Sequence, residues 1–481
     1  MPVGDAIRAS RKVIEEILES DRVVYGVNTG FGKLSEVKIP ADHLDELQLN
    51  LIRSHAAGVG EPFPESVTRA IMLLRANVLA KGNSGVRLEV VQLLLDMLNQ
   101  RIHPIIPAKG SVGASGDLAP LAHLALTLIG EGNTMSGSRL LSGSEALQEK
   151  GLTPISLKAK EGLALINGTQ AMTGVGALAW LDATRLCKVA DITGAMTLDA
   201  MRGTDTAFDD RIVKVRPHAG AIAVARNLRD LMHGSNIRES HRDSPHKVQD
   251  HYSLRCIPQV HGAVRDALRV AEQWLTIEMN AATDNPLVFP DDRELLSGGN
   301  FHGAPMALLF DFLSIASAQL ANISERRTAL LVDSSESELP AFLSPNPGLN
   351  SGFMIAQVTA AALVSENKVL AHPASVDSIP TSANKEDHVS MGVTAATKFH
   401  HIVQNAAYVI AIELLCAAQA IDLLKPLATS APLQKAVDLV RARVPHMEKD
   451  RFLAADINAV TELIDESHFI EQLESVLNHS L

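Results

Sequence analysis

A stretch rich in small residues, KGSVGASGDLAPLAH, runs from Lys109 to His123. It places Ala114, Ser115 and Gly116 in a row, shortly before an apolar run. In such a triplet the nitrogen of Gly116 can attack the carbonyl carbon of Ala114 and close a five-membered ring, because glycine has no Cβ to obstruct the closure. Loss of water from Ser115 then leaves an exocyclic methylene. The product is a strong electrophile that needs no external cofactor.

The same stretch has two other interpretations. A phosphate-binding loop needs the pattern GxxxxGK[ST], but Lys109 precedes the glycines, and the dinucleotide pattern GxGxxG is also absent. A plain turn would lead into a helix, with Asp117 near the cap and Pro120 in the first turn. Composition alone favours the turn, so the choice depends on the rest of the chain.

Helices must position this stretch, since apolar residues recur at three- and four-residue spacings and alternating strand-like runs are few. The pattern predicts a mainly α protein, with a loop-rich N-terminal domain over residues 1–167 and a long-helix bundle with C-terminal helices over 168–481. Long polar connectors at 203–216, 233–255 and 284–303 are of a length that is commonly functional or disordered. The predicted helical segments are 66–98 with an interruption at 81–85, 118–129, 306–331, 351–370, 389–424 and an amphipathic outer layer over 433–477.

Composition excludes several classes of protein. The 481 residues are 46% hydrophobic and carry a formal net charge of −12, which argues against nucleic acid or an anionic membrane as partner. The three cysteines form no CxxC pair, so no disulfide framework is expected. Residues 163–181 lack charge but include Asn167 and Gln170, which favours a buried helix over a membrane span. The first residues show no signal-peptide pattern, so we expect a cytoplasmic protein.

Histidines raise the question of a metal site, because the chain has 18 of them. His241, His246 and His251 recur at five-residue spacing, and His400 and His401 are adjacent. None belongs to an HExxH or a Cys/His zinc pattern. We therefore expect no catalytic metal.

The segment GSVGASGDLAPLAH resembles the signature of the aromatic amino-acid ammonia-lyases, which carry a 4-methylidene-imidazol-5-one (MIO) group. The resemblance covers nearly the whole chain, and Ala374–Gly392, ASVDSIPTSANKEDHVSMG, is most similar to the histidine-specific members. Further similar blocks are YGVNTGFG (Tyr25–Gly32), SHAAGVG (Ser54–Gly60), INGTQ (Ile166–Gln170), QDHYSLRCIPQVHGA (Gln249–Ala263), TDNPL (Thr283–Leu287), GGNFHG (Gly298–Gly303) and NSGFMIAQVTAAAL (Asn350–Leu363).

The resemblance implies a fumarase/aspartase-like helical fold and a homotetramer whose active sites draw residues from more than one subunit. It implies an MIO group formed autocatalytically from Ala114, Ser115 and Gly116. The implied reaction is the first step of histidine degradation, the β-elimination of ammonia from L-histidine to give trans-urocanate. The chain starts closer to the Tyr25 block than relatives usually do, so a short leader is expected to be absent.

Elimination needs a base for a barely acidic β-proton, and the resemblance implies Tyr25. Alternatively, Tyr25 is a packing residue at the end of the apolar run RVVY. An unperturbed tyrosine has a pKa near ~10, so neighbours must lower the pKa of Tyr25 if it acts as the base.

Five further residues have roles that the resemblance implies. Arg255 would clamp the substrate carboxylate, since a guanidinium matches a carboxylate in two parallel bonds. Asn167 would contact the substrate amine or the MIO ring, with a helix-capping role as the alternative. Tyr252 and Gln249 would lie near the MIO group, and Phe301 would wall the pocket. For Gln249 and Phe301 a purely structural role is nearly as well supported.

Substrate choice is predicted to depend on His55 and Glu386. A carboxylate at position 386 can accept a hydrogen bond from an imidazole N–H, which suits histidine better than phenylalanine. Lys385 stands where the family commonly has glutamine, and its charge could pair with Glu386 or point away. The alternatives are a tyrosine or phenylalanine ammonia-lyase, a 2,3-aminomutase of the same family, and a non-catalytic helical scaffold.

Overall fold

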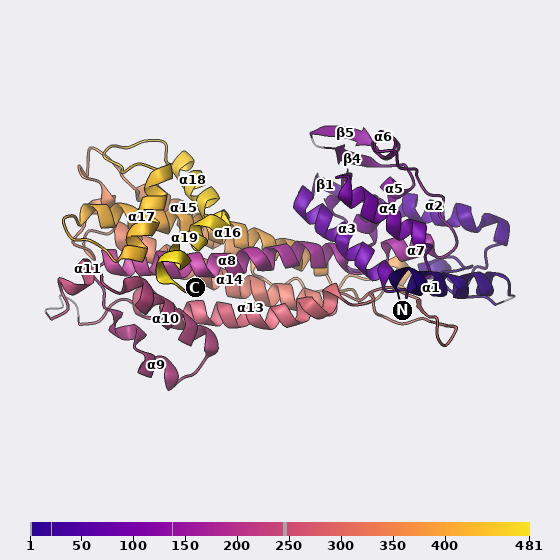
Figure 1. Ribbon diagram of the computed structural model, residues 1–481, viewed down its shortest axis with the longest axis horizontal. Coiled ribbons are helices and arrows are strands. Elements are labelled where there is room, and N and C mark those ends of the chain that lie inside the picture. Colours follow the sequence, from indigo (N-terminus) through magenta and orange to yellow (C-terminus); the bar gives the residue numbers. More distant parts are fainter. Residues whose placement is uncertain (1, 21, 137, 244–247) are drawn as a thin grey trace. The chain divides into compact units, whose positions relative to one another are not determined.

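The computed structural model describes residues 2–20, 22–136, 138–243 and 248–481 (Figure 1). The chain forms two compact units, each built from three segments of sequence. The first unit comprises Met1–Leu178, Glu272–Asp311 and Pro373–Thr397; the second comprises Ala179–Ala271, Phe312–His372 and Lys398–Leu481. The predicted mainly α class is confirmed. The predicted domain boundary after residue 167 stays a prediction.

The first unit contains short helices and small antiparallel sheets around the triplet. Its helices are α1 (Val3–Leu18), α2 (Leu44–His55), α3 (Glu65–Ala80), α4 (Leu88–Asn99), α5 (Leu118–Leu128), α6 (Gly143–Glu149) and α7 (Glu161–Ile166), with 3-10 turns η1 (Gly32–Leu34), η2 (Ala41–His43) and η5 (Ser382–Asn384). Its strand pairs are β1 (Val59–Pro62) with β3 (Pro107–Lys109), β4 (Asn133–Ser136) with both β2 (His103–Pro104) and β5 (Arg139–Ser142), and β6 (Leu287–Phe289) with β7 (Glu294–Leu296).

Helices dominate the second unit, and four long helices contribute residues to both units. The long helices are α8 (Gln170–Ala200), α13 (Ile257–Met279), α14 (Ala304–Val332) and α16 (Gly392–Leu423). The other elements of the second unit are η3 (Asp205–Phe208), α9 (Asp210–Lys214), α10 (Ala219–Met232), α11 (Asn236–Glu239), α12 (Tyr252–Arg255), η4 (Ala341–Leu343), α15 (Met354–Leu370), α17 (Ala431–Arg443), α18 (Leu453–Asp465) and α19 (Ser467–Leu477).

Two of the long helices, α14 and α16, are long and apolar enough to cross a membrane by length and composition. Their most apolar windows are 67% and 83% buried inside the protein. Helices that are apolar on most faces are typically covered by neighbouring elements. Both are therefore core helices of the protein.

The predicted single helix over residues 163–181 is wrong in one respect. The structure ends α7 at Ile166 and begins α8 at Gln170, so three residues between them are not helical. Gly168 in this break has a φ of 138°, a conformation that glycine adopts without strain. The break lets the backbone at Gly168 pair with Gly116 of the triplet, which a continuous helix could not do.

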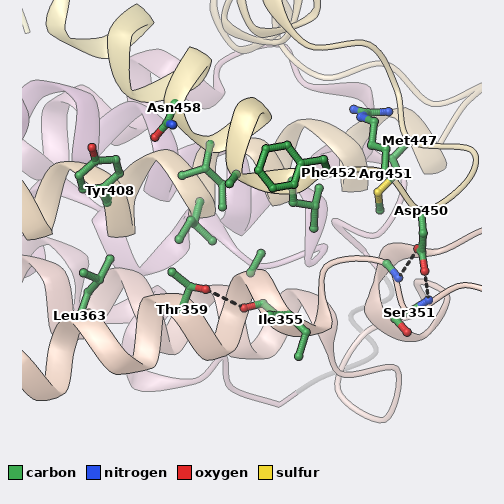
Figure 2. Close-up of a pocket in the computed structure, with 16 residues that line it drawn as sticks. Ser351, Ile355, Thr359, Leu363, Tyr408, Met447, Asp450, Arg451, Phe452 and Asn458 are labelled. Carbon is green, nitrogen blue, oxygen red and sulfur yellow. Dashed lines mark hydrogen bonds between the residues drawn. The ribbon is translucent and has the colours of Figure 1, made fainter.

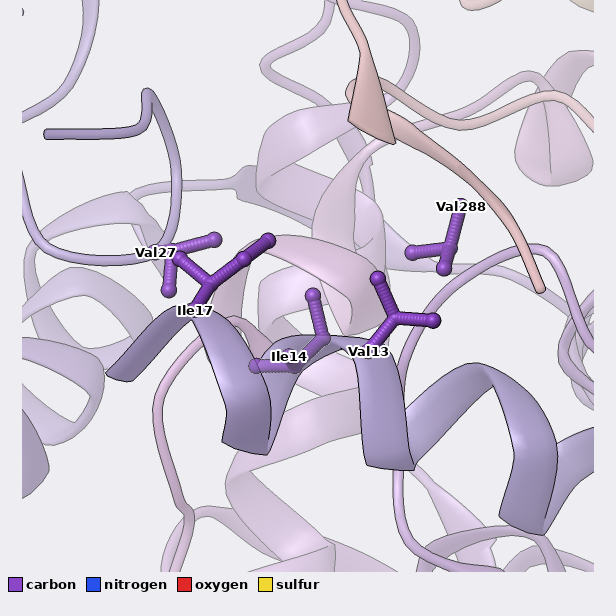
Figure 3. Close-up of a cluster of buried hydrophobic side chains, with 5 residues drawn as sticks. All are labelled: Val13, Ile14, Ile17, Val27 and Val288. Carbon is purple, nitrogen blue, oxygen red and sulfur yellow. The ribbon is translucent and has the colours of Figure 1, made fainter. Parts of the chain in front are cut away.

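A small apolar cluster anchors the loop that carries Tyr25. The helix α1 presents Val13, Ile14 and Ile17 toward Val27 of this loop and Val288 of β6 (Figure 3). All five side chains are buried, and Val27 has no exposed surface. Fully burying an aliphatic side chain contributes roughly 1.5–3 kcal/mol. This packing fixes the backbone two residues after Tyr25.

Candidate active site

The triplet forms a tight turn immediately before α5. Ser115 has a φ of 53° and Gly116 a φ of 80°, both in the left-handed region. The N–H of Gly116 donates to the carbonyl oxygen of Gly113 at 3.3 Å. A non-glycine residue such as Ser115 seldom adopts a positive φ, so its surroundings must hold it there. The turn bends the chain at the three residues that the sequence marks for ring closure.

Only glycine fits at the third position of the triplet. A Cβ built on Gly116 would lie 2.2 Å from the carbonyl oxygen of Gly168. The N–H of Asp117 donates to that same oxygen at 2.7 Å, and the N–H of Gly168 donates to the carbonyl of Ser115 at 3.4 Å. The segment between α7 and α8 therefore clamps the triplet through its backbone.

Asp117 is the residue before α5, as predicted, but its side chain does not cap that helix. Its carboxylate instead accepts from the N–H of Met172 at 2.8 Å and from the hydroxyl of Ser111 at 3.2 Å. Burial raises the pKa of Asp117 to about 7, against the opposing effects of these bonds and of the Arg75 charge. The side chain thus ties the first residues of α8 to the turn that carries the triplet.

A cavity of about 480 Å³ in the first unit brings together four of the predicted site residues: Tyr25, His55, Ser115 and Glu386. Among the described residues that line it, none is a lysine or an arginine. The remaining lining residues, mostly apolar, are Gly30, Phe31, Gly32, Leu34, Val37, Ile39, Leu47, Asn50, Leu51, Ser54, Leu118, Leu163, Ile166 and Ser382. The pocket therefore combines an apolar wall with a few polar groups, as small-molecule sites usually do.

Glu386 touches the triplet directly. The hydroxyl of Ser115 donates to its Oε1 at 3.0 Å, and the hydroxyl of Thr381 donates to its Oε2 at 2.8 Å. Backbone bonds between Thr381 and Glu386 close a short loop around η5, whose residues all have positive φ. Lys385 is exposed. Both carboxylate oxygens are therefore oriented by hydroxyl groups.

The hydrogen bonds of His55 define its tautomer. Its Nδ1 lies 2.8 Å from the carbonyl oxygen of Leu51, one turn earlier in α2. Because a carbonyl oxygen can only accept, Nδ1 carries the proton, and Nε2 of the neutral ring is then an acceptor. In this form His55 offers an acceptor for an N–H group.

Burial raises the pKa of the Tyr25 phenol in this chain, and the negative charge of Glu386 raises it further. The N–H of Gly32 donates to the phenol oxygen and opposes the shift. The sequence-based expectation of a lowered pKa is therefore wrong for the chain taken by itself. A positive charge would have to come from residues that do not line this pocket.

We expect Glu386→Gln to move the titration of Tyr25 to lower pH, because the substitution removes a charge that favours the neutral phenol. The chain has only three tyrosines, so ¹³C labelling of the tyrosine ring gives a simple spectrum to follow against pH. Tyr25→Phe identifies the signal. An unchanged or higher midpoint would show that the two groups do not interact.

Asn167, the residue after α7, is buried with 2% of its surface exposed. Its Nδ2 donates to the carbonyl oxygen of Asn285 at 2.8 Å and to Oδ1 of Asp284 at 3.4 Å. Its Oδ1 has no hydrogen-bond partner among the described residues. Buried polar atoms are nearly always paired, so this oxygen is available to accept a hydrogen bond from a further donor.

Besides Ala114, Gly116 and Asn167, which are described above or flank Ser115, four more predicted site residues do not line the pocket. Phe301 belongs to the first unit and is partly buried just before α14. Gln249, Tyr252 and Arg255 belong to the second unit, at or just before α12. Tyr252 is 72% exposed, and the Arg255 guanidinium lies 4.5 Å from the centre of its ring. These two side chains form a stacked pair on the surface of the chain.

A second cavity, of about 590 Å³, lies in the second unit between α15, α16 and the segment that leads into α18 (Figure 2). Asp450 at its rim accepts from the backbone N–H groups of Ser351 and Gly352. Arg451 is paired with Asp456 at 2.7 Å. The ionisable groups of this cavity are thus engaged in holding loops, and the lining is otherwise largely apolar.

No metal-binding arrangement is found among the residues that the structure describes, since no three His, Cys, Asp or Glu side chains converge. His241 is buried and bonds to the carbonyl oxygens of Ile237 and Gly203. His246 lies outside the described residues.

Sequence reasoning missed Thr381 and the apolar wall of the pocket. Thr381 stands five residues before Glu386, and only the reversal of the chain at η5 brings its hydroxyl to the carboxylate. Phe31 lies within the block YGVNTGFG and could have been found from that resemblance. Leu47 and Leu51 look in sequence like ordinary residues of an amphipathic helix.

The fold and the triplet pocket define an aromatic amino acid lyase. A family model described as "Aromatic amino acid lyase" matches residues 3–442, and the chain belongs to this family. It is an ammonia-lyase, as the sequence predicts.

Three individual proteins show how similar the chain is to members of the family. The chain is 58% identical over 472 residues to histidine ammonia-lyase of Koribacter versatilis, covering 95% of this chain and 91% of that protein. The crystal structure of histidine ammonia-lyase from Trypanosoma cruzi aligns with a TM-score of 0.92 and 48% identity, over 98% of this chain and 89% of that one. Tyrosine aminomutase from Streptomyces globisporus aligns with a TM-score of 0.93 and 40% identity, over 98% and 93% of the two chains.

Proposed function

We propose that this chain removes ammonia from L-histidine and releases trans-urocanate. The observation that carries the proposal is the pocket in which the Glu386 carboxylate and the His55 ring lie with Ser115. Both groups accept hydrogen bonds, so they suit the N–H groups of an imidazole and an amine. The greater identity to histidine ammonia-lyases than to a tyrosine aminomutase supports the same substrate.

The triplet fits the MIO group that members of this family use. The cradle around Gly116 excludes any side chain, and the turn at Ser115 already brings neighbouring backbone groups together. Ala114, Ser115 and Gly116 would supply the ring atoms, and Gly168 and Asp117 would hold them through backbone bonds. When present, the group supplies an electrophile that makes the substrate amine a better leaving group.

The side chains of the pocket perform the remaining work. Tyr25, as the phenolate, removes the β-proton, and the electrons of the C–H bond form the new double bond. The C–N electrons leave with the nitrogen, which takes up one proton, equivalent to the one that Tyr25 removed, and departs as ammonia; Tyr25 thereby returns to the phenolate. Glu386 accepts from the imidazole of the substrate, and the apolar wall around it excludes water, which strengthens each polar contact.

We also propose that the enzyme is a cytoplasmic homotetramer with shared active sites. Among the residues that the structure describes, no lysine or arginine lines the pocket to bind the substrate carboxylate, whereas Arg255 and Tyr252 are presented together on α12. An arginine from a neighbouring subunit would supply this carboxylate clamp. Its positive charge would also lower the pKa of the Tyr25 phenol toward the range that a general base needs.

Ammonia release from separate incubations with histidine, tyrosine and phenylalanine tests the substrate. We expect ammonia and the ultraviolet absorption of urocanate with histidine, and rates near background with the other two. A β-amino acid without net ammonia would identify an aminomutase instead. No urocanate from histidine would end the assignment.

A further inference from the structure

A fully buried ion pair between Lys160 and Asp284 contacts Asn167 through the Asp284 carboxylate. The Lys160 ammonium donates to Oδ2 of Asp284 at 2.9 Å, and neither side chain is exposed to solvent. Lys160 stands at the start of α7 with a φ of 74°, and Asn167 follows the end of the same helix. Burying two charges is expensive, so such a pair is weak evidence for stability. Its position next to a candidate site residue indicates another role.

The second oxygen of Asp284 organises the segment around Asn167. Its Oδ1 accepts from the N–H of Asn285 at 2.7 Å and from Nδ2 of Asn167 at 3.4 Å. The carbonyl oxygen of Asn285 accepts from the same Nδ2 at 2.8 Å. The side chain of Asn285 is held in turn by the N–H of Gly298 at 2.7 Å. Each partner of the Asn167 amide is therefore itself fixed.

These partners settle which end of the amide points where. A carboxylate and a carbonyl oxygen can only accept, so the NH₂ group of Asn167 must face them. Its Oδ1 is then the atom left without a partner, and it is an acceptor only. In the chain, Asn167 stands between Ile166, which lines the pocket, and Gly168, whose backbone pairs with Gly116 of the triplet. The resemblance implies that Asn167 contacts either the substrate amine or the MIO ring. An unpartnered acceptor suits a hydrogen-bond donor, so the arrangement favours the contact with the amine.

We propose that Lys160 and Asp284 are positioning residues that keep the Asn167 amide in this orientation, so that its oxygen accepts from the substrate amine. The proposal rests on the proposed function. The Lys160 ammonium donates to Oδ2 of Asp284, and a carboxylate paired in this way accepts from Asn167 and cannot donate to it. A neutral group at position 284 could donate to Oδ1 and turn the amide around.

The test replaces the pair with apolar side chains, Lys160→Met with Asp284→Leu. Removing both charges avoids an uncompensated buried ion, and such replacements are often neutral for stability. We expect a folded tetramer whose mass shows the same loss of water as the wild type. Its kcat on histidine should fall roughly 10- to 100-fold, the effect of losing a hydrogen bond to a charged group. KM should change much less than kcat.

Two comparisons separate orientation from general damage. Adding Asn167→Ala to the paired variant should cause little further loss, because residues that act through one group are not additive. The matched control is Arg87→Met with Glu161→Gln, which removes another ion pair of a buried carboxylate at the start of α7. This pair does not touch Asn167, and the control should keep the wild-type kcat.

Several results would overturn the proposal. These are a wild-type kcat in the paired variant, full additivity with Asn167→Ala, an equal loss in the control, or a mass that lacks the loss of water. If the paired variant does not fold, Asp284→Asn alone keeps the side-chain shape and must show the same fall in kcat. Failure of the proposed function is distinguishable, because the wild-type enzyme itself would then release no urocanate.

Discussion

Ser115→Ala is expected to fold normally and to lose activity by a factor on the order of 10³ or more, the scale seen when a covalent catalytic group is removed. Alanine has no β-hydroxyl to eliminate, so no exocyclic methylene can form. The structural loss is small, because formation of the electrophile in the wild type itself eliminates the Ser115 hydroxyl, and with it the hydrogen bond that this hydroxyl donates to Glu386.

Intact mass checks this prediction independently of activity. The mature wild-type chain should be lighter than its encoded sequence by two water molecules, one from ring closure and one from Ser115. The Ser115→Ala variant must retain at least the water molecule that the wild type loses from Ser115. Its thermal unfolding should match that of the wild type within a few degrees. An unfolded variant would show that the stretch is structural, and an active one would exclude the electrophile.

Mixed tetramers are expected to recover activity that neither parent has. Ser115→Ala leaves Arg255 intact, and Arg255→Met leaves the triplet intact. If a site takes Ser115 from one subunit and Arg255 from another, random mixing restores about a quarter of the sites. Each parent alone should be near background, since one lacks the electrophile and the other the carboxylate clamp.

Two different affinity tags allow mixed tetramers to be purified from co-expressed chains, and activity per site is then measured on histidine. Native mass confirms that both chains are present. Mixed tetramers without activity would place Arg255 in the same site as the Ser115 of its own chain. A protein that is monomeric by light scattering would remove the basis for shared sites.

Local sequence signals were sufficient for several helices, although α1, α2, α10 and α13 were not predicted. The predicted start of a helix at Leu118 agrees with α5, and the interruption predicted at 81–85 lies in the gap between α3 and α4. These features depend on turn residues and apolar spacing within one segment. The break at Gly168 was missed, because its cause is a pairing with Gly116, more than fifty residues earlier in the chain.

The chemistry of the site was only partly predictable for the same reason. The resemblance indicated Tyr25, Ser115 and Glu386, and the structure brings all three to one pocket. It could not indicate Lys160 and Asp284, because a charged residue gives no sign in sequence that it will be buried. The direction of the Tyr25 pKa shift likewise depends on burial and on a carboxylate more than three hundred residues away.

The contact between Gly116 and Gly168 limits how this enzyme can be re-engineered. A Cβ on Gly116 would lie 2.2 Å from the carbonyl oxygen of Gly168, and a Cβ on Gly168 would lie 2.4 Å from the carbonyl oxygen of Thr283. A library directed at new substrates would therefore lose every member that changes either glycine. Diversity is better introduced at Leu47 and Leu51, which face the pocket from a helix whose backbone need not move. The residues proposed to form the reactive group are thus separate from the residues at which substrate selectivity can be varied.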